Sequence, residues 1–378
     1  MIKHKLMARH SYMQIDSIAN LPGPDENGFI SHYVFQYIDF NEVPQYIAAG
    51  HKWHDCFFLG CAIPKEMQES LDPTNLQFPR LGLPYSTFRG SLYTAEELYE
   101  GFDPDKPQTF ETCRDSLIYN HFMEKGKQCK EIRETLGRSL HDRGIEDTMA
   151  DFLSHYGETQ VVAIMGGHAL KRTDPEYRKI ALISKDLTEK GKLMASGGGP
   201  GAMEATHLGA WMAGRTDEEM EEAFAMLEPS PTFRDEGWLA SAFKVRERFP
   251  QKRFRSLGIP TWFYGHEPST PLATDIAKYF QNSMREDILL TIAKGGIIYS
   301  PGSAGTLQEI FQDAAQNHYK TVGLSSPMVF LGKEFWGKEI PVYEMLETLM
   351  ASGRYQNLLL TLTDEREEAV QAIMSFKG

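Results

Sequence analysis

The strongest constraint on the fold of this chain is the regular alternation of short apolar runs with amphipathic stretches after Gly157. The runs TQVVAIMGG (159–167) and KLMASGGGPG (192–201) both end in glycines. Each is followed by residues whose apolar positions recur at helical spacing. Such alternation is typical of a parallel sheet covered by helices, and continuous apolar strands are expected where both faces of a sheet are buried. We therefore predict a doubly wound α/β domain over residues 156–378.

The later part of this domain should continue the same Rossmann-like pattern with a mainly parallel sheet. We expect a strand over 259–265, a helix over 273–295, a strand over 296–302 and a helix over 306–319. The charged, proline-containing residues 214–256 interrupt the alternation, and we predict that they form an insertion or a long helical connection.

The first 155 residues have a different character, and the chain length allows two compact units. Aromatic, β-prone runs at 32–40 and 55–63 indicate strands, whereas apolar residues recur at helical spacing from 112 to 156. We predict a separate N-terminal α+β domain over 1–155, whose role the sequence does not indicate.

The charge of the chain excludes some partners. A formal net charge of −13 opposes tight binding to nucleic acid, which needs a basic surface. The four cysteines are too few for a secreted disulfide framework of this size, and no segment has the length and apolar character of a signal peptide or a membrane span. We expect a cytoplasmic protein that binds neither nucleic acid nor a membrane.

Three predicted strands end in glycine-rich turns. In open parallel sheets the carboxyl ends of the strands meet at one edge, where glycine lets a ligand approach the backbone and helix N-termini offer free N–H groups. Any one turn could be purely structural, but three at one edge predict a shared anion pocket. The candidate residues are Gly166, Gly167, Gly198, Gly199, Gly201, Gly302, Ser303, Ala304, Gly305 and Thr306.

A dinucleotide site is the alternative for the second turn, since Gly197-x-Gly199-x-x-Ala202 matches the G-x-G-x-x-G/A pattern. That motif should follow the first strand and be answered by an acidic residue at the end of the next strand. Here it follows the second strand, and the acidic run 217–222 lies in helical or loop sequence. We therefore expect no nicotinamide or other cofactor.

Glu309 and Arg285 are the candidate catalytic pair. Thr306-x-x-Glu309 could be a capping box in which the carboxylate only ties down the start of a helix. Against that, the helix carrying Arg285 leads into the strand before Pro301, so a guanidinium and a carboxylate can face the same glycine-lined opening. Such a pair suits a phosphorylated sugar, whose phosphate needs donors and whose anomeric carbon develops positive charge.

A zinc site is an alternative reading of His51, His54, Cys56 and Cys61. The spacing fits none of the usual ligand patterns, and residues five apart on a strand should point to opposite faces. We expect no metal.

Two motifs in order carry a resemblance to a known family. Residues 197–204 read GGGPGAME and residues 301–309 read PGSAGTLQE, with Arg285 on the helix before the second motif. Over about 157–376 the chain resembles the LOG family of nucleotide phosphoribohydrolases, and its long N-terminal region is closest to the longer bacterial nucleotide 5′-monophosphate nucleosidases. Ser303 stands where the family turn has glycine, and Glu286 stands where many members have lysine.

The resemblance implies hydrolysis of the N-glycosidic bond of a nucleoside 5′-monophosphate to free base and ribose 5-phosphate. It implies catalytic roles for Glu309 and Arg285, places Glu204 in the nucleotide site, and implies a homodimer or higher homo-oligomer. His168 and Asp313 are candidates by location for the acid that protonates the departing base. The alternative is a nucleotide-sensing regulatory protein without turnover, and the base preference stays open.

Overall fold

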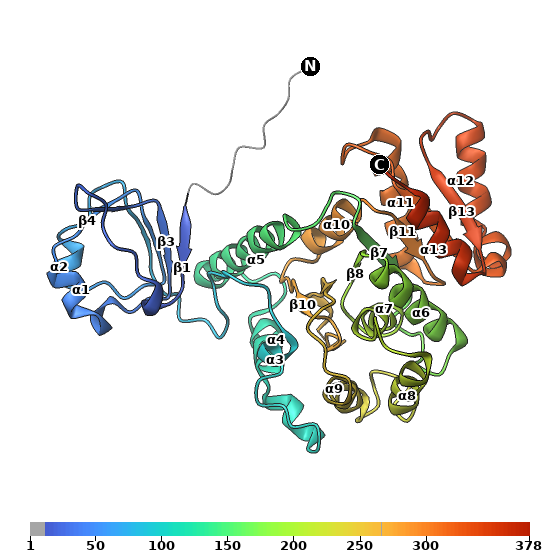
Figure 1. Ribbon diagram of the computed structural model, residues 1–378, viewed down its shortest axis with the longest axis horizontal. Helices are drawn as coiled ribbons and strands as arrows, with labels where there is room; N and C mark the ends of the chain where they lie inside the picture. The colour runs from blue at the N-terminus through green and yellow to red at the C-terminus, as the bar shows by residue number, and fades with distance from the viewer. Residues whose placement is uncertain (1–11, 266) are drawn as a thin grey trace. The chain divides into compact units, whose positions relative to one another are not determined.

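The computed structural model describes residues 12–265 and 267–378, which divide into two compact units (Figure 1). The smaller unit comprises the residues up to Ser91 together with Gln128–Thr148, and the larger comprises Leu92–Lys127 and Met149–Gly378. The division therefore differs from the expected boundary at 155, because the segment 92–127 packs with the C-terminal sheet.

The larger unit is built on one seven-stranded sheet in which every pairing is parallel. The strand order is β10-β9-β8-β7-β11-β12-β13. The strands are β7 (Val161–Met165), β8 (Leu193–Ser196), β9 (Ser256–Gly258), β10 (Asp275–Ile276), β11 (Ile297–Tyr299), β12 (Pro327–Leu331) and β13 (Leu359–Thr363). The predicted doubly wound fold is confirmed, since the chain runs outward from β7 in one direction and then returns to β11 on its other side.

Helices cover both faces of this sheet. The helices α6 (Pro175–Glu189), α7 (Ala202–Trp211) and α13 (Arg366–Ser375) pack together around one buried apolar cluster. Right-handed crossovers place α10 (Asn282–Ile292), α11 (Ala304–Tyr319) and α12 (Val342–Ala351) on the opposite face. The insertion forms α8 (Asp217–Leu227) and α9 (Trp238–Arg248), as the predicted helical connection required.

Two predicted elements between β9 and α10 are wrong. Strand β9 ends at Gly258, and Trp262–Tyr264 within the expected strand form a 3-10 turn capped by Thr261. The expected helix over 273–295 begins only at Asn282, because Asp275–Ile276 form strand β10. Short apolar runs do not distinguish a buried strand from a buried helix by their period, and here the pairing with β9 decides.

The segment 92–127 is tied to the larger unit by a buried ion pair. It contains α3 (Ala95–Leu98), the 3-10 turn Pro107–Thr112 and α4 (Arg114–Lys125). The Lys278 amine donates to both oxygens of Asp115 at 2.7 and 2.8 Å, and the Trp262 indole donates to the same carboxylate at 2.9 Å. Removing one member of such a pair leaves an uncompensated buried charge, so this anchor explains why the segment belongs with the sheet.

The smaller unit is a short solenoid of stacked coils. Its four-stranded parallel sheet runs β1 (Met13–Ile15), β3 (Tyr33–Gln36), β5 (Phe57–Leu59) and β6 (Leu76–Phe78), with β2 (Phe29–Ser31) paired to β4 (Lys52–His54). Helical turns α1 (Pro44–Ala48) and α2 (Lys65–Gln68) return two of the coils, and α5 (Ile132–Leu153) begins in this unit. Positive φ recurs at equivalent corners, His32 with Asp55 and Tyr37 with Gly60.

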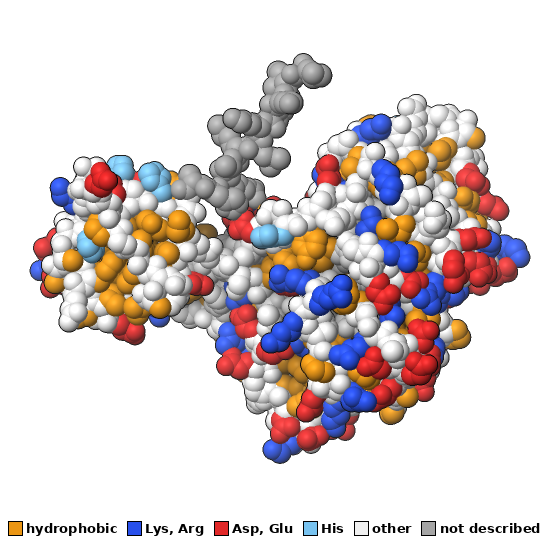
Figure 2. Space-filling model, viewed as in Figure 1, with side chains coloured by type: hydrophobic (Ala, Val, Ile, Leu, Met, Phe, Trp, Pro, Cys, Tyr) orange, Lys and Arg blue, Asp and Glu red, His pale blue; other side chains and the backbone are white. Residues whose placement is uncertain are grey.

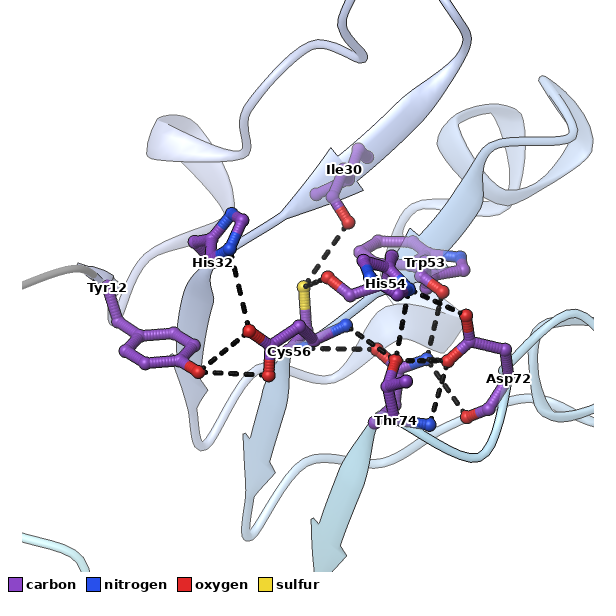
Figure 3. Close-up of polar contacts among 10 residues, drawn as sticks. Tyr12, Ile30, His32, Trp53, His54, Cys56, Asp72 and Thr74 are labelled. Atoms are coloured by element: carbon purple, nitrogen blue, oxygen red, sulfur yellow. Dashed lines mark hydrogen bonds and ion pairs between the residues drawn. The ribbon is translucent and has the colours of Figure 1, made fainter.

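Aromatic rings fill the solenoid, where Phe35 stacks on Phe58 at 5.2 Å. Figure 3 shows the edge of this core, with the Cys56 thiol donating to the Ile30 carbonyl at 3.3 Å. Cys61 packs against the same cluster and donates to the Phe35 carbonyl. The expectation that Cys56 and Cys61 point to opposite faces is wrong, because β5 ends at Leu59 and Gly60 turns the chain.

Within the described residues, no group of three or more His, Cys, Asp or Glu side chains could hold a metal ion. In the same residues, no helix combines the length and apolar character that crossing a membrane requires. Figure 2 shows acidic and basic side chains interspersed over the visible surface of the larger unit, which agrees with a chain that carries no excess of positive charge.

Candidate functional site

The candidate site lies where the strand order of the large sheet reverses. Strands β7 and β11 are neighbours there, and the connections that follow them lead to opposite faces. Open α/β sheets bind ligands at such a point, beyond the carboxyl ends of the strands. The turn after β7 contains Gly166 and Gly167, and the turn after β11 runs from Ser300 to Thr306, so two of the three predicted turns meet at this edge.

These two turns are held together by the backbone. The Gly167 N–H donates to the Pro301 carbonyl at 3.2 Å, and the Ser300 N–H donates to the Met165 carbonyl at 2.9 Å. A Cβ at Gly166 would overlap the Ser300 hydroxyl. Glycine is thus required for this close approach, and Gly166 and Gly167 keep part of their surface exposed.

The N-terminus of α11 is open and uncapped. Ser303 is the N-cap with an extended backbone, and its side chain makes no capping bond. The first backbone bond is from the Leu307 N–H to the Ser303 carbonyl at 3.0 Å. Among the described residues, no acceptor is present for the N–H groups of residues 302–306, and Ser303, Ala304 and Gly305 are exposed. Free N–H groups and the helix dipole make such a terminus suited to a phosphate.

Glu309 lies in the second turn of α11, facing inward. Because the helix begins at Ala304, Thr306 is not its N-cap, and the capping-box alternative for Glu309 is wrong. No hydrogen bond to its carboxylate occurs in the described part of the chain. Burial raises the pKa of Glu309 to about 7, although the Arg285 charge opposes this and the Glu286 charge adds to it.

Arg285 reaches the same region from α10. Its Nε donates to the Ile259 carbonyl at 2.9 Å, beyond the end of β9. Its Nη2 lies against Gly197, where a Cβ would overlap it. With Nε held and no ion pair among the described residues, the two Nη groups can contact a ligand.

Glu286, next on α10, is held by two amides. Asn282 donates to one of its oxygens at 2.7 Å and Gln308 of α11 donates to the other at 3.1 Å. These contacts join α10 to α11 and keep the negative charge of Glu286 near Glu309. This charge raises the pKa of Glu309.

The second glycine turn is buried rather than open. Gly198 has φ +70° and its N–H donates to the Ser196 hydroxyl at 3.1 Å. Gly201 has φ +68°, and a Cβ there would overlap the Gly167 carbonyl. Residues 197–201 are all buried. Gly198, Gly199 and Gly201 therefore have a packing role, and their contact with a phosphate stays a prediction.

Glu204 does not face the predicted site. Its carboxylate is fully buried and accepts from Arg172 Nε at 2.9 Å, from Arg172 Nη2 at 2.5 Å and from the Tyr177 hydroxyl at 3.0 Å. Both oxygens are therefore occupied within the protein. The predicted contact of Glu204 with a nucleotide is corrected to a structural ion pair.

The two candidates for a general acid are placed very differently. Asp313 is buried and accepts from the Tyr299 hydroxyl at 2.7 Å and from the Asn317 amide at 3.1 Å. Burial raises the pKa of Asp313 to about 7, although the Tyr299 hydrogen bond lowers it. This carboxyl is enclosed, whereas the His168 side chain is exposed beside Gly167. Only His168 can meet a ligand directly.

Sequence reasoning missed the Ile259 carbonyl, which orients Arg285, and the Arg172 side chain, which binds Glu204. No local signal could have found them, since both contacts join distant segments.

Comparisons with known proteins identify no family. No protein-family model and no curated protein matches the chain. Among solved structures, it is similar to the molybdenum cofactor binding protein from Rippkaea orientalis, with 13% identity and TM-score 0.37 over 58% of this chain and 98% of that one. It is also similar to the X-ray structure of TM1055, with 21% identity and TM-score 0.38 over 57% and 99%. A third neighbour is the Moco carrier protein from Chlamydomonas reinhardtii, with 14% identity and TM-score 0.36 over 57% and 96%.

Proposed function

We propose that the chain hydrolyses the N-glycosidic bond of nucleoside 5′-monophosphates, releasing the free base and ribose 5-phosphate. The observation that carries the proposal is the open N-terminus of α11 with Glu309 on the same helix. The carboxylate has a pKa of about 7 and no hydrogen bond in the described residues. A partly buried carboxyl without a partner lowers stability, and perturbed groups of this kind cluster at functional sites.

The phosphate would bind the free N–H groups of residues 302–306, with Arg285 neutralising charge on the phosphate or ribose. Cleavage of the C–N bond passes through an oxocarbenium-like state, as in glycoside hydrolysis. Ionised Glu309 would stabilise that cation or position the attacking water. Electrostatic stabilisation by preorganised groups is worth several kcal/mol of barrier.

The test is incubation of the purified full chain with purine and pyrimidine nucleoside monophosphates. Free base is followed by chromatography and ribose 5-phosphate by an enzymatic assay. We expect release by the parent protein and none by Glu309→Gln, which keeps the shape of the side chain. The control is Glu344→Gln, an exposed carboxyl on α12, which should keep full turnover. Turnover by Glu309→Gln at the parental rate would remove Glu309 from the mechanism.

A nucleotide-sensing regulator remains the competing function. It would need the turns but not Glu309, so tight binding of nucleotides with no release of base by any variant would favour it. The homodimer or higher oligomer implied by the family resemblance stays a prediction, which sedimentation of the full chain would test.

A further inference from the structure

A cavity of about 190 Å³ opens beside the glycine turns of the larger unit. It is lined by the turn between β7 and α6, by Gly201, and by the loop between α8 and α9. The loop residues are part of the insertion, so this chain adds a wall of its own to the edge of the sheet where the candidate site lies.

The loop is fixed by the buried side chain of Arg172. Its backbone N–H donates to the Pro231 carbonyl at 3.0 Å. Its guanidinium donates to the Ser230 carbonyl at 3.1 Å and to the Trp238 carbonyl at 3.0 Å, while Glu204 neutralises its charge. Arg172 is 2% exposed. A buried guanidinium without partners would be costly, so Arg172 should keep its bonds to the loop carbonyls. The cavity wall is therefore fixed before any ligand enters.

The cavity combines aromatic surface with positive charge. The rings of Phe233 and His168 lie 6.3 Å apart at an interplanar angle of 70°. Lys171 and Arg234 also line the cavity, and both are exposed to solvent. The Arg234 guanidinium lies over the Phe233 ring, 5.5 Å from its centroid. A flat heterocycle with ring nitrogens and exocyclic oxygens matches this surface, since it can stack on the other face of Phe233 and accept hydrogen bonds from the cations.

The size and position of the cavity suit one end of a ligand. Complete ligand pockets usually span about 300–1,000 Å³, so 190 Å³ would hold a single ring system rather than a whole nucleotide. Gly167 separates the cavity from the α11 terminus, because it precedes His168 in the chain and donates to the Pro301 carbonyl. The α11 terminus and the cavity therefore lie on either side of Gly167, and a ligand that spans both would place its phosphate on residues 302–306 and its ring beside Phe233.

We propose that this cavity is the base subsite, in which Phe233 stacks on the nucleobase of a nucleoside 5′-monophosphate. The inference rests on the proposed function and assigns its base recognition to the insertion loop. Phe233 and Arg234 then determine which bases bind, whereas residues 302–306 bind the phosphate of any substrate.

The experiment measures equilibrium binding by calorimetry with the full chain carrying Glu309→Gln, so that no ligand is consumed. The probes are AMP, CMP and ribose 5-phosphate. We expect Phe233→Ala to weaken AMP binding about tenfold or more, the usual effect of losing a base–aromatic stack, and to leave ribose 5-phosphate within about twofold. Phe233→Tyr should retain AMP affinity. Tyr319→Ala, which removes a ring that is 73% exposed at the end of α11, should change neither.

The outcomes separate the two proposals. Unchanged AMP affinity in Phe233→Ala, or an equal loss for ribose 5-phosphate, overturns the base subsite and leaves hydrolysis untouched. A selective loss of AMP affinity in a protein whose Glu309 parent releases no base supports the subsite and removes the hydrolase. Failure of the full chain to bind AMP at millimolar concentration overturns both.

Discussion

The replacement Glu309→Gln should make the protein more stable at neutral pH, and the gain should vanish in acid. The pKa of Glu309 is about 7 in the folded chain against an ordinary value of 4.5. The folded state therefore holds the proton more tightly than the unfolded state does. The carboxyl costs nothing while it is protonated in both states, and its ionisation destabilises the fold as pH rises through the window from 4.5 to 7.

The magnitude follows from the size of the shift. The full difference in pKa would correspond to about 3 kcal/mol, since one unit is worth about 1.4 kcal/mol. Glu309 is only partly buried, and water screens its charge. We therefore expect Glu309→Gln to raise the free energy of unfolding by about 1–2 kcal/mol at pH 8 and to leave it unchanged at pH 4.

The assay is urea unfolding of the parent and of Glu309→Gln at several pH values from 4 to 8, comparing the two proteins at each pH. The matched control is Glu344→Gln, whose carboxyl is exposed on α12 and should show no such dependence. A Glu309→Gln effect that is constant across the pH range, or that grows in acid, would refute the reasoning from burial.

Three further outcomes are expected. If ionised Glu309 acts in catalysis, kcat/KM should fall below pH 7, and Glu286→Gln should move that limb to lower pH because Glu286 raises the pKa of Glu309; pH–rate profiles of both proteins check this. Gly305→Ala adds a Cβ that meets nothing within 4 Å, so it should stabilise α11 by about 0.5–1 kcal/mol. It should also weaken ribose 5-phosphate binding, because the added methyl group occupies open space at the helix terminus where the phosphate would bind. Thermal unfolding measures the first effect and calorimetry the second. Glu204→Gln should cost about 3–5 kcal/mol of stability by leaving Arg172 unpaired; urea unfolding with little loss would restore Glu204 as a candidate ligand contact.

The large sheet could be predicted from the sequence because its signals are local. Strands β7, β8, β11 and β12 are short apolar runs that are followed by glycine and then by helical sequence, and these signals do not depend on distant contacts. Strands β9 and β10 lack this pattern, and there the prediction was wrong. The position of the site followed from the same pattern, since the carboxyl ends of parallel strands meet at one edge. Helix starts were less well placed. Ala304 and Gly305 are helical here, although their sequence reads as part of a turn.

Long-range pairs could not be predicted. Nothing near Glu204 in the sequence indicates Arg172, and nothing near Asp115 indicates Lys278. The sequence therefore does not indicate the partner of either acid, and the family resemblance alone implies a nucleotide contact for Glu204. Buried ion pairs are chosen by tertiary packing, so local motif matching mistakes them for functional carboxylates.

The stacked coils of the smaller unit also carry a signal in the sequence. Two segments, Ile30-x-x-Tyr33-x-Phe35-x-x-Ile38-x-Phe40 and Trp53-x-x-Cys56-x-Phe58-x-x-Cys61-x-Ile63, share one spacing of apolar residues. The register pairs Phe35 with Phe58, which confirms that the two segments are equivalent coils. Cys56 and Cys61 occupy apolar positions of this spacing and pack in or against the core of the smaller unit.

Two carboxyls on α11 support placing the candidate site at the start of this helix. Glu309 and Asp313 are one turn apart, and burial raises the pKa of each to about 7. Tyr299 and Asn317 satisfy Asp313, which is therefore part of the packing between α11 and β11. Glu309 has no such hydrogen-bond partner within residues 12–265 and 267–378, and it is the carboxyl closer to the free N–H groups. The positive helix terminus that can hold an anion is thus followed by a carboxyl whose ionised form receives no hydrogen bond from the part of the chain that the structure describes. A ligand could satisfy both groups if its phosphate binds the free N–H groups and its positive charge develops beside Glu309, about one helical turn further along α11.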